Sequence, residues 1–262
     1  MSAPDDTAAT AARFSRGADA YLRLWAPVLR PHAVRLVEAL PIAGAGRVLE
    51  VGAGVGALLP EIARAAPRAR VFGSDVATGM LALAPKEFPV SAMDAARLAL
   101  HTASLDAVVM AFMLFLVPAA AAALEEVRRV LRPGGVLGIV TWLGQPMFPA
   151  QEIWEEEIGS LSGSPVPRWP TITSSEDELS SLVSAAELAI VRCWSESFLY
   201  RSDLDGFLDL RLGLGRIWLE PLTPDARQAF VERVRRRLQR LPPEGFANRA
   251  TVLHAIARAP AR

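Results

Sequence analysis

The sequence predicts an α/β protein with a seven-stranded, mostly parallel sheet, helices on both faces of that sheet, additional N-terminal helices and an inserted lid. From residue 46 onward, short apolar runs alternate with stretches of helical composition, which is typical of strand–helix–strand units. The runs are apolar on both sides, as expected for strands that helices cover on both faces. A glycine-rich turn follows the first run directly.

The first half of the predicted sheet consists of four strands. The helix after the first strand ends at Pro67, which cannot continue it. The expected elements are, in order, strand 47–51, helix 57–66, strand 70–74, helix 78–83, strand 89–93 and strand 105–111.

In the second half, the helix at 119–131 ends at the sequence Arg-Pro-Gly-Gly of residues 132–135, because proline stops a helix and glycines permit a turn. Residues 145–170 mix prolines, glycines and tryptophans and lose the regular alternation, so we expect an inserted lid there. The remaining expected elements are strand 136–142, helix 175–186, strand 189–198, a helical stretch 203–241 and a closing strand 251–257.

The predicted domain organisation follows these elements. Apolar residues at helical spacing between residues 18 and 40, interrupted by Pro27 and Pro31, predict two helices beside the mouth of the sheet. The expected divisions are a disordered tail 1–13, N-terminal cap helices 14–45, the Rossmann-like core 46–142, the lid with one helix 143–188, and the C-terminal strands 189–262 with their helical insertion at about 203–241.

Composition limits the classes of partner. Lysines and arginines equal aspartates and glutamates at 28 each, so we expect a small-molecule partner and neither nucleic acid nor an anionic membrane. The single cysteine, Cys193, excludes an internal disulfide and a thiolate metal cluster, which favours the cytoplasm. Residues 107–124 carry no charge, but Pro118 favours a buried strand followed by a helix over a membrane span. The protein is expected to be a monomer or a homodimer.

The sharpest motif is the glycine turn after the first strand. Gly52, Gly54 and Gly56 alternate with apolar residues between that strand and the next helix. Glycine permits a tight bend and a close approach of backbone to ligand, and the helix N-terminus offers free N–H groups. The motif alone does not distinguish a dinucleotide from an adenosyl ligand.

Two acidic residues near this turn help to distinguish a dinucleotide from an adenosyl ligand. Glu50 is charged within an otherwise apolar strand end, which suits a ligand with an ammonium or sulfonium group and not a pyrophosphate. Asp75 ends the second strand, 19 residues after Gly56, where an acid can accept both hydroxyls of a ribose. A ribose is therefore predicted for either ligand type, and Glu50 favours the adenosyl ligand.

In these features the sequence resembles the class I S-adenosylmethionine-dependent methyltransferases, specifically the small-molecule group called methyltransferase type 11, which includes the ubiquinone-biosynthesis enzymes. The matching segments stand in the family's order and spacing over residues 14–142, and more loosely over 189–257. They are residues 48–56, Ser74-Asp75 with Met80-Leu81, Met93-Asp94-Ala95 with Leu98, residues 105–109 and residues 127–142.

The resemblance implies S-adenosyl-L-methionine as cofactor and assigns residues to it. Gly52, Ala53 and Gly54 would lie along its methionine part, and Asp75 would hold the ribose. Val76 and Met80 would sandwich the adenine, whose edge would bond to Asp94 and Ala95. Ala111 and Phe112 would stand near the sulfonium, with Phe14 and Tyr21 closing over the site. The complete predicted cofactor set is Tyr21, Glu50, Gly52, Ala53, Gly54, Gly56, Asp75, Val76, Met80, Asp94, Ala95, Ala111 and Phe112.

The substrate side of the site is predicted from aromatic residues. We expect an apolar acceptor pocket lined by Phe14, Trp25, Phe115, Trp142 and Phe148. Residues 111–118 contain no acid, amide or histidine that could act as a base, so no catalytic residue is assigned, and no metal site is predicted.

The predicted function is transfer of a methyl group from S-adenosylmethionine to a small, apolar molecule, with oxygen or nitrogen favoured as acceptor atom and carbon possible. Two alternatives remain. A protein of this fold can bind the cofactor without transferring its methyl, and the apolar segment 111–118 favours that reading. A nicotinamide-dependent oxidoreductase fits the glycine turn, but the chain has only two tyrosines, Tyr21 and Tyr200, neither in a tyrosine–lysine pair at helical spacing.

Overall fold

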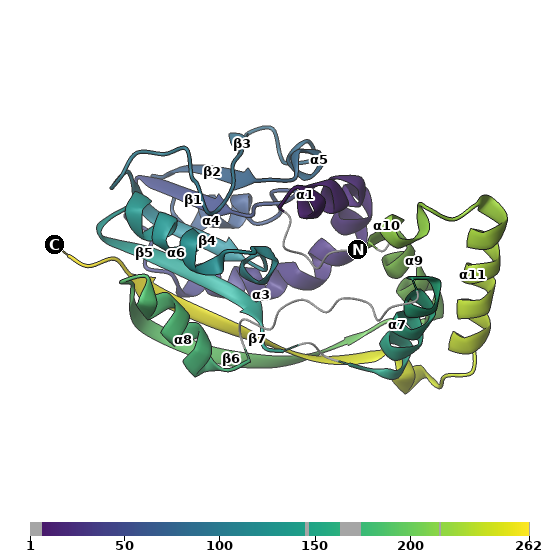
Figure 1. Cartoon of the computed structure of the whole chain (residues 1–262). Helices are drawn as coiled ribbons and strands as arrows, with labels where there is room; N and C mark the ends of the chain where they lie inside the picture. Colours follow the sequence, from purple (N-terminus) through teal and green to yellow (C-terminus); the bar gives the residue numbers. More distant parts are fainter. Residues whose placement is uncertain (1–6, 145–146, 163–173, 215, 262) are drawn as a thin grey trace.

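The computed structural model describes residues 7–144, 147–162, 174–214 and 216–261. They form one seven-stranded sheet with strand order β3-β2-β1-β4-β5-β7-β6 and helices on both faces (Figure 1). The strands β1 to β5 are parallel to one another, whereas β7 is antiparallel to both β5 and β6. This confirms the predicted fold class. The strands are β1 (Arg47–Val51), β2 (Arg70–Asp75), β3 (Val90–Ala92), β4 (Leu105–Ala111), β5 (Leu131–Trp142), β6 (Ala189–Arg201) and β7 (Ala247–Arg258).

The helices divide into an N-terminal group, helices that cover the sheet, and a helical group at one end of the molecule (Figure 1). They are α1 (Thr7–Arg16), α2 (Ala18–Ala20), the π-helical turn η1 (Tyr21–Trp25), α3 (Ala26–Ala39), α4 (Leu59–Ala65), α5 (Thr78–Leu81), the 3₁₀ turn η2 (Leu114–Leu116), α6 (Ala120–Val130), α7 (Pro149–Ser162), α8 (Glu176–Ala185), α9 (Leu204–Leu214), α10 (Arg216–Leu219), α11 (Pro224–Leu238) and the 3₁₀ turn η3 (Pro243–Phe246).

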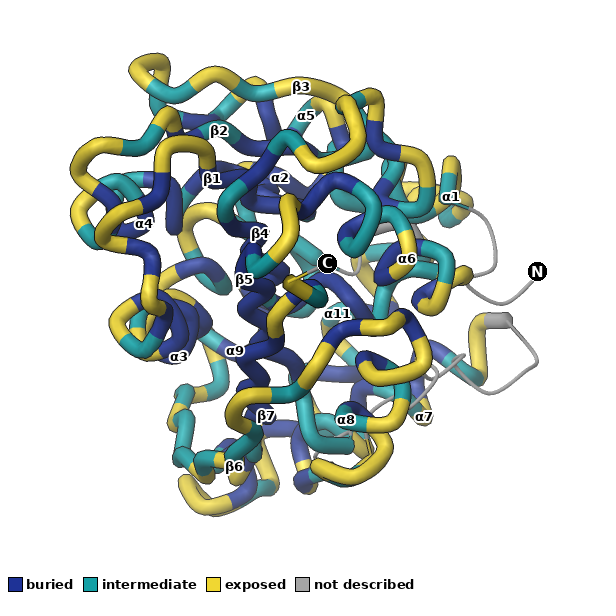
Figure 2. The backbone as a smooth tube through the Cα atoms, turned by 90° about the vertical axis from the view of Figure 1, so that its left-hand side faces the viewer, coloured by how far each residue is buried: buried dark blue, intermediate teal, exposed yellow. Residues whose placement is uncertain are grey.

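Two hydrophobic cores lie on opposite faces of the sheet because successive side chains of a strand point to opposite sides. Leu49 and Val108 belong to the core that α6 and α8 cover, whereas Val48 and Val109 belong to the core that α3 and α4 cover. Burial is concentrated in the central strands, and the edge strands β3 and β6 are largely exposed or half-buried (Figure 2). The predicted apolar strand faces are confirmed for the centre of the sheet.

A third core is formed by the helical group. Trp154 of α7, Phe207 of α9 and Phe230 of α11 are buried there, and Phe246 joins them from η3. The strands β6 and β7 extend from the sheet toward this group (Figure 1), and so they are longer than predicted. The helical stretch 203–241 is confirmed as α9, α10 and α11.

The N-terminal predictions require correction. Residues 7–13 are not a disordered tail but the start of α1, whose alanine-rich sequence favours a helix and which packs against α5. Pro27 and Pro31 do not separate two helices. Pro27 stands in the first turn of α3, where no N–H donor is needed, and Pro31 is accommodated inside the helix.

The expected loss of regular structure at residues 145–170 is wrong for residues 149–162, and the role of this region as a lid stays a prediction. Of residues 145–170, the segments 145–146 and 163–170 lie outside the described residues. Most of the remainder is the regular helix α7, which packs against α11 and η3 within the third core. The physical reason is that Trp154 and Ile158, one helical turn apart, find an apolar partner surface in the helical group.

Candidate functional site

The glycine turn occupies the carboxyl end of β1, as the sequence predicts. Gly52, Gly54 and Gly56 have φ of +72°, +53° and +69°, the left-handed region that favours glycine. A Cβ atom on Gly52 would lie 2.5 Å from Cβ of Met113, and one on Gly54 would lie 3.1 Å from Cε of Met80. Both the conformation and the space therefore require glycine at the first position.

Ala53 and Gly56, also predicted to bind the cofactor, support the shape of the turn from outside the cavity. The amide of Ala53 donates to the carbonyl of Ser74 over 2.8 Å, and its side chain would touch any Cβ placed on Gly73. A Cβ on Gly56 would meet Pro85 at 2.9 Å. Ala53 and Gly56 thus hold the turn against neighbouring elements and do not line the pocket.

Asp75 lies at the end of β2, directly beside the turn. Its Oδ2 accepts the amide of Gly54 and its Oδ1 accepts the amide of Ala77, each over 2.8 Å. Burial raises the pKa of this carboxyl, although the backbone hydrogen bonds act in the opposite direction. Each oxygen retains a second lone pair, so Asp75 can still accept hydroxyl groups from a ligand.

Glu50 lies in β1, two residues before Gly52, and it is not among the residues that line the described pocket. The side chain is 3% exposed, and within the described part of the chain its buried Oε2 has no hydrogen-bond partner. Burial first, and the nearby charge of Asp75 second, raise its pKa well above the usual range. A buried carboxyl group without a partner is costly, so a cationic or hydrogen-bond-donating ligand would stabilise it.

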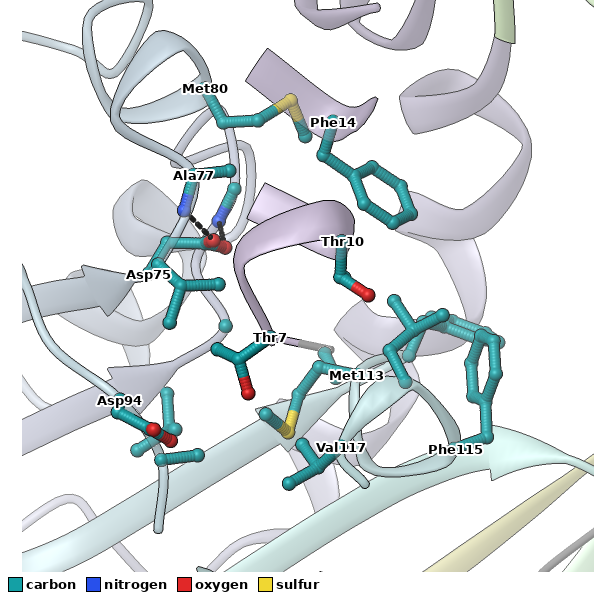
Figure 3. Close-up of a pocket in the computed structure, with 18 of the residues that line it drawn as sticks. Thr7, Thr10, Phe14, Asp75, Ala77, Met80, Asp94, Met113, Phe115 and Val117 are labelled. Carbon is teal, nitrogen blue, oxygen red and sulfur yellow. Dashed lines mark hydrogen bonds between the residues drawn. The ribbon is translucent and has the colours of Figure 1, made fainter. Parts of the chain in front are cut away.

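A pocket of about 890 Å³ not filled by atoms, part of it open to solvent, lies above these residues. Its floor is formed by the carboxyl ends of β1, β2 and β4, and α1 and η1 cover it (Figure 3). Open α/β sheets bind ligands at this edge. Asp75 and Asp94 face the cavity from neighbouring strand ends, and Phe14 approaches from α1 (Figure 3).

Most of the predicted site residues meet at this pocket. The predicted cofactor residues on its wall are Tyr21, Gly52, Gly54, Asp75, Val76, Met80, Asp94, Ala95, Ala111 and Phe112. The predicted substrate residues on its wall are Phe14, Trp25, Phe115 and Trp142. Phe148 is instead buried in the third core, with its ring centroid 6.0 Å from that of Phe207, because α7 joins the helical group.

Several pocket residues escaped the sequence analysis. Thr7 and Thr10 line the cavity from α1, which the sequence analysis assigned to a disordered tail, and Met113 covers Gly52 (Figure 3). Met93 and Val117 also lie on the wall. The helix-forming alanines around Thr7 and Thr10 were the one available signal for α1.

Aromatic rings form the wall opposite Asp75. Trp142 lies with its ring centroid 6.1 Å from Trp25 and 5.1 Å from Phe112, and Phe115 lines the same region. Phe112 has φ of +53°, a strained conformation for a bulky residue that places it at the end of β4. This wall offers an apolar, ring-binding surface.

The titratable side chains that line the described pocket are Tyr21, Asp75 and Asp94, all on the side of the glycine turn. Burial raises the pKa of Tyr21, and the charges of Glu50 and Asp75 raise it further, so its hydroxyl stays protonated at neutral pH.

His254 is buried with its ring stacked on Trp194, and its Nε2 lies 3.2 Å from the carbonyl of His32, away from the cavity. Among the described residues, no group of three or more histidine, cysteine, aspartate or glutamate side chains could hold a metal ion.

Comparison with known proteins agrees with this geometry. Residues 49–139 match the family model described as a methyltransferase domain, the segment that contains the glycine turn, Asp75 and Asp94. This segment of the chain is therefore similar to a methyltransferase domain, and the seven-stranded sheet that contains it has a Rossmann-like methyltransferase fold. The ubiquinone/menaquinone biosynthesis C-methyltransferase UbiE of Syntrophotalea carbinolica is 39% identical over 120 residues, which cover 43% of this chain and 50% of that protein. The chain thus spans about half the length of this curated relative.

Solved structures extend the likeness of the fold beyond this segment. Phosphoethanolamine N-methyltransferase 2 of Haemonchus contortus, in complex with phosphomonomethylethanolamine and S-adenosylhomocysteine, has a TM-score of 0.52 at 16% identity, over 88% of this chain and 52% of that chain. The cyclase SpnF has a TM-score of 0.56 at 17% identity, over 88% of this chain and 81% of that chain. The methyltransferase fold therefore also carries other chemistry. No described helix is long and apolar enough to cross a membrane.

Asp75→Ala should weaken cofactor binding by roughly 1–3 kcal/mol, the scale of leaving buried polar groups unpaired. The substitution removes the carboxylate expected to receive the ribose hydroxyls and also leaves the amides of Gly54 and Ala77 without their acceptor. Calorimetric titration measures the effect, with Asp225→Ala on the exposed start of α11 as the control. Equal affinity of Asp75→Ala and the unmodified protein would contradict the ribose assignment.

Proposed function

We propose that this protein transfers the methyl group of S-adenosylmethionine to a small, largely apolar molecule. The observation that carries the proposal is the buried carboxyl of Glu50, whose Oε2 has no partner among the described residues, two residues before a glycine turn that lines a pocket. A ligand with an ammonium group would stabilise the charged form of this carboxyl, whereas a pyrophosphate has no donor for Oε2 and would oppose ionisation of the carboxyl further. The methyltransferase family match over residues 49–139 supports the same ligand.

The residues at the pocket fit S-adenosylmethionine. Gly52 and Gly54 offer a cradle that side chains would fill, and Glu50 offers a partner for the ammonium group. Asp75 offers acceptors for ribose hydroxyls, and Asp94 offers a further acceptor on the pocket wall, across the view from Phe115 (Figure 3). Val76 and Met80 supply apolar contact for the adenine ring.

The bound cofactor would supply an activated methyl group on a sulfonium. The contribution of this chain is then to orient an acceptor atom and to exclude water. The aromatic wall of Phe112, Phe115, Trp25 and Trp142 orients a flat acceptor, and α1 with η1 covers the cavity. An amine nitrogen attacks through its lone pair and releases its proton to solvent after transfer, so it needs no general base, whereas a phenol oxygen reacts as the phenolate after its proton has gone to solvent.

For the acceptor we propose an oxygen or nitrogen atom of a ring-bearing molecule, with carbon as the second choice. The curated relative is named a C-methyltransferase, but the match covers half of its length. The family match at residues 49–139 contains most of the proposed cofactor residues, so it carries little information about the acceptor. The carbon-13 chemical shift of the transferred methyl group in the product distinguishes the three atom types.

Two alternative functions would give different results in ligand-binding experiments. A protein that keeps the cofactor site without methyl transfer would bind S-adenosylmethionine and leave it intact, and the structural likeness to a protein named as a cyclase, SpnF, makes this alternative worth testing. A nicotinamide-dependent oxidoreductase would bind a dinucleotide beside Glu50, which its buried carboxyl opposes. The aromatic wall and covered pocket favour neither alternative over transfer.

The transfer step is tested by incubating the purified protein with S-adenosylmethionine that carries a deuterated methyl group and with the small-molecule fraction of the source cells. We expect a deuterated product and an equal amount of S-adenosylhomocysteine. Gly52→Ala, which fills the cofactor cradle, is the inactive control. Cofactor binding without any labelled product would contradict transfer and favour the non-transferring alternative.

A further inference from the structure

A second cavity lies at the amino ends of the strands whose carboxyl ends form the candidate cofactor pocket. Arg47 is the first residue of β1 and Arg70 is the first residue of β2, and both line this cavity. Its volume not filled by atoms is about 800 Å³, part of it open to solvent. The two cavities share no lining residue, so a ligand of the second one, here called the arginine cavity, would bind apart from S-adenosylmethionine.

The parallel register of β1 and β2 makes Arg47 and Arg70 direct neighbours. Their side chains share one face of the sheet, because Leu49 and Phe72, two residues further along each strand, both belong to the core that α6 and α8 cover. Adjacent strands lie about 4.8 Å apart, so two positive charges at neighbouring positions repel each other. This arrangement costs the fold free energy, and an anion bound between the two guanidinium groups would offset that cost.

The described residues supply no acid that neutralises the two arginines. No aspartate or glutamate lines the arginine cavity, and neither guanidinium group forms an ion pair or a hydrogen bond with a described residue. Asp106, on the adjacent strand β4, is already engaged. Its Oδ2 accepts the amides of Gly46 and Arg47 over 2.8 and 2.7 Å, and its Oδ1 pairs with Arg132. The positive charge of the cavity is therefore left for a ligand.

Apolar and polar side chains complete the lining. Phe72 and Leu105 supply an apolar surface, and Ser91 and His101 offer hydrogen-bonding groups. Phe72 lies on the same face of β2 as Arg70, two residues further along the strand. A ring in contact with Phe72 would therefore hold a charged substituent close to the arginines.

The loop that forms one wall of the arginine cavity is fixed to the sheet-covering helix α6. The guanidinium group of Arg129 donates to the carbonyls of Leu98 and Leu100 over 2.9 and 2.8 Å. The amide of Ala103 donates to the carbonyl of Arg129 over 2.9 Å. Because the wall is already in place, a ligand would not have to order this loop, which lowers the entropic cost of binding.

We propose that the arginine cavity binds a phosphate monoester that carries a planar ring. A phosphate monoester has a charge of roughly −1.5 to −2 at pH 7, which matches the two positive charges. Guanidinium forks bind phosphate oxygens with two parallel hydrogen bonds, and Ser91 and His101 can engage a third oxygen. A carboxylate offers one charge and two oxygens, so it fits less well. The inference goes beyond the proposed function and does not depend on methyl transfer.

The test uses phenyl phosphate, benzoate and inorganic phosphate as probes. Each is titrated calorimetrically into the full chain at low salt in a buffer without phosphate. We expect phenyl phosphate to bind at least about tenfold more tightly than benzoate, and also more tightly than inorganic phosphate. Benzoate that binds as tightly as phenyl phosphate would overturn the phosphate class. Inorganic phosphate that does so would overturn the contact with the ring, and no binding of phenyl phosphate would overturn the site itself.

Variants then assign the binding to the arginine cavity. Arg47→Gln and Arg70→Gln should each weaken phenyl phosphate binding at least about tenfold, whereas Arg236→Gln, on an exposed position of α11, should leave it unchanged. Both arginines are exposed, and removal of either relieves their repulsion, so the melting temperature should stay equal or rise. Phe72→Leu should bring the affinity for phenyl phosphate closer to that for inorganic phosphate. Unchanged affinity in both Arg47→Gln and Arg70→Gln would place the anion elsewhere and overturn the proposal.

Discussion

Gly52→Ala is expected to weaken S-adenosylmethionine binding by at least about 100-fold, or roughly 2.8 kcal/mol. The added Cβ would lie 2.5 Å from Cβ and 2.6 Å from Cγ of Met113, so one of the two segments must move into the pocket. The φ of +72° adds backbone strain of about 1–3 kcal/mol for any residue with a side chain. Calorimetric titration and thermal unfolding measure the two effects.

Substitutions at two other glycines distinguish the effect of the steric clash with Met113 from the effect of backbone strain. Gly134 has φ of +75°, and a Cβ added there would have nothing within 4 Å, so Gly134→Ala should lose stability and keep its cofactor affinity. Gly44 has open space and no positive φ, so Gly44→Ala should change neither quantity. Full cofactor affinity in Gly52→Ala would show that the turn does not hold the ligand.

Glu50→Gln is expected to change binding and stability in opposite directions. Cofactor affinity should fall roughly 10- to 100-fold, because a charge-assisted hydrogen bond to the ammonium group is replaced by a neutral one. The ligand-free protein should become more stable at neutral pH, because an amide replaces a buried carboxyl that has no partner for Oε2 among the described residues. A residue with a merely structural role would not give this combination.

The pH dependence of the ligand-free protein follows from the raised pKa of Glu50, which is caused first by burial and then by Asp75. The folded protein holds the Glu50 proton more tightly than the unfolded chain does. The resulting stabilisation is full below the ordinary pKa of 4.5 and is lost as the pH rises through the folded value. The stability advantage of Glu50→Gln should therefore grow with pH across that window.

Thermal unfolding of both proteins at a series of pH values measures this trend, and Glu125→Gln, on an exposed position of α6, is the control. The pKa of Asp75 is also raised, so part of the pH dependence should remain in Glu50→Gln. A stability difference that is constant with pH would contradict a buried, uncompensated Glu50.

The centre of the fold was predictable because its signals are local. The strand at residues 47–51 is apolar, the glycines stand directly after it, and each needs the left-handed conformation that only glycine adopts easily. Asp75 could be placed beside the turn because the carboxyl ends of parallel strands meet at one edge. The same reasoning predicted that Asp94 would lie at this edge.

The elements that the sequence analysis placed wrongly depend on distant partners. The helix α1 is short and has no buried residue of its own, and it is held by α5 and by the pocket wall. Phe148 was expected at the pocket because it follows β5, but the apolar residues of α9 and α11 draw it into the third core. Periodicity within one segment does not reveal which surface that segment will meet.

The central claim is most directly tested by parallel calorimetric titration of the purified protein with S-adenosylmethionine, S-adenosylhomocysteine and a nicotinamide dinucleotide. Binding of the first two at micromolar strength, without binding of the dinucleotide, is the expected result and would support the interpretation of Glu50, Asp75 and the glycine turn as an adenosylmethionine site. Absence of binding by both sulfur compounds, whatever the dinucleotide does, would contradict it.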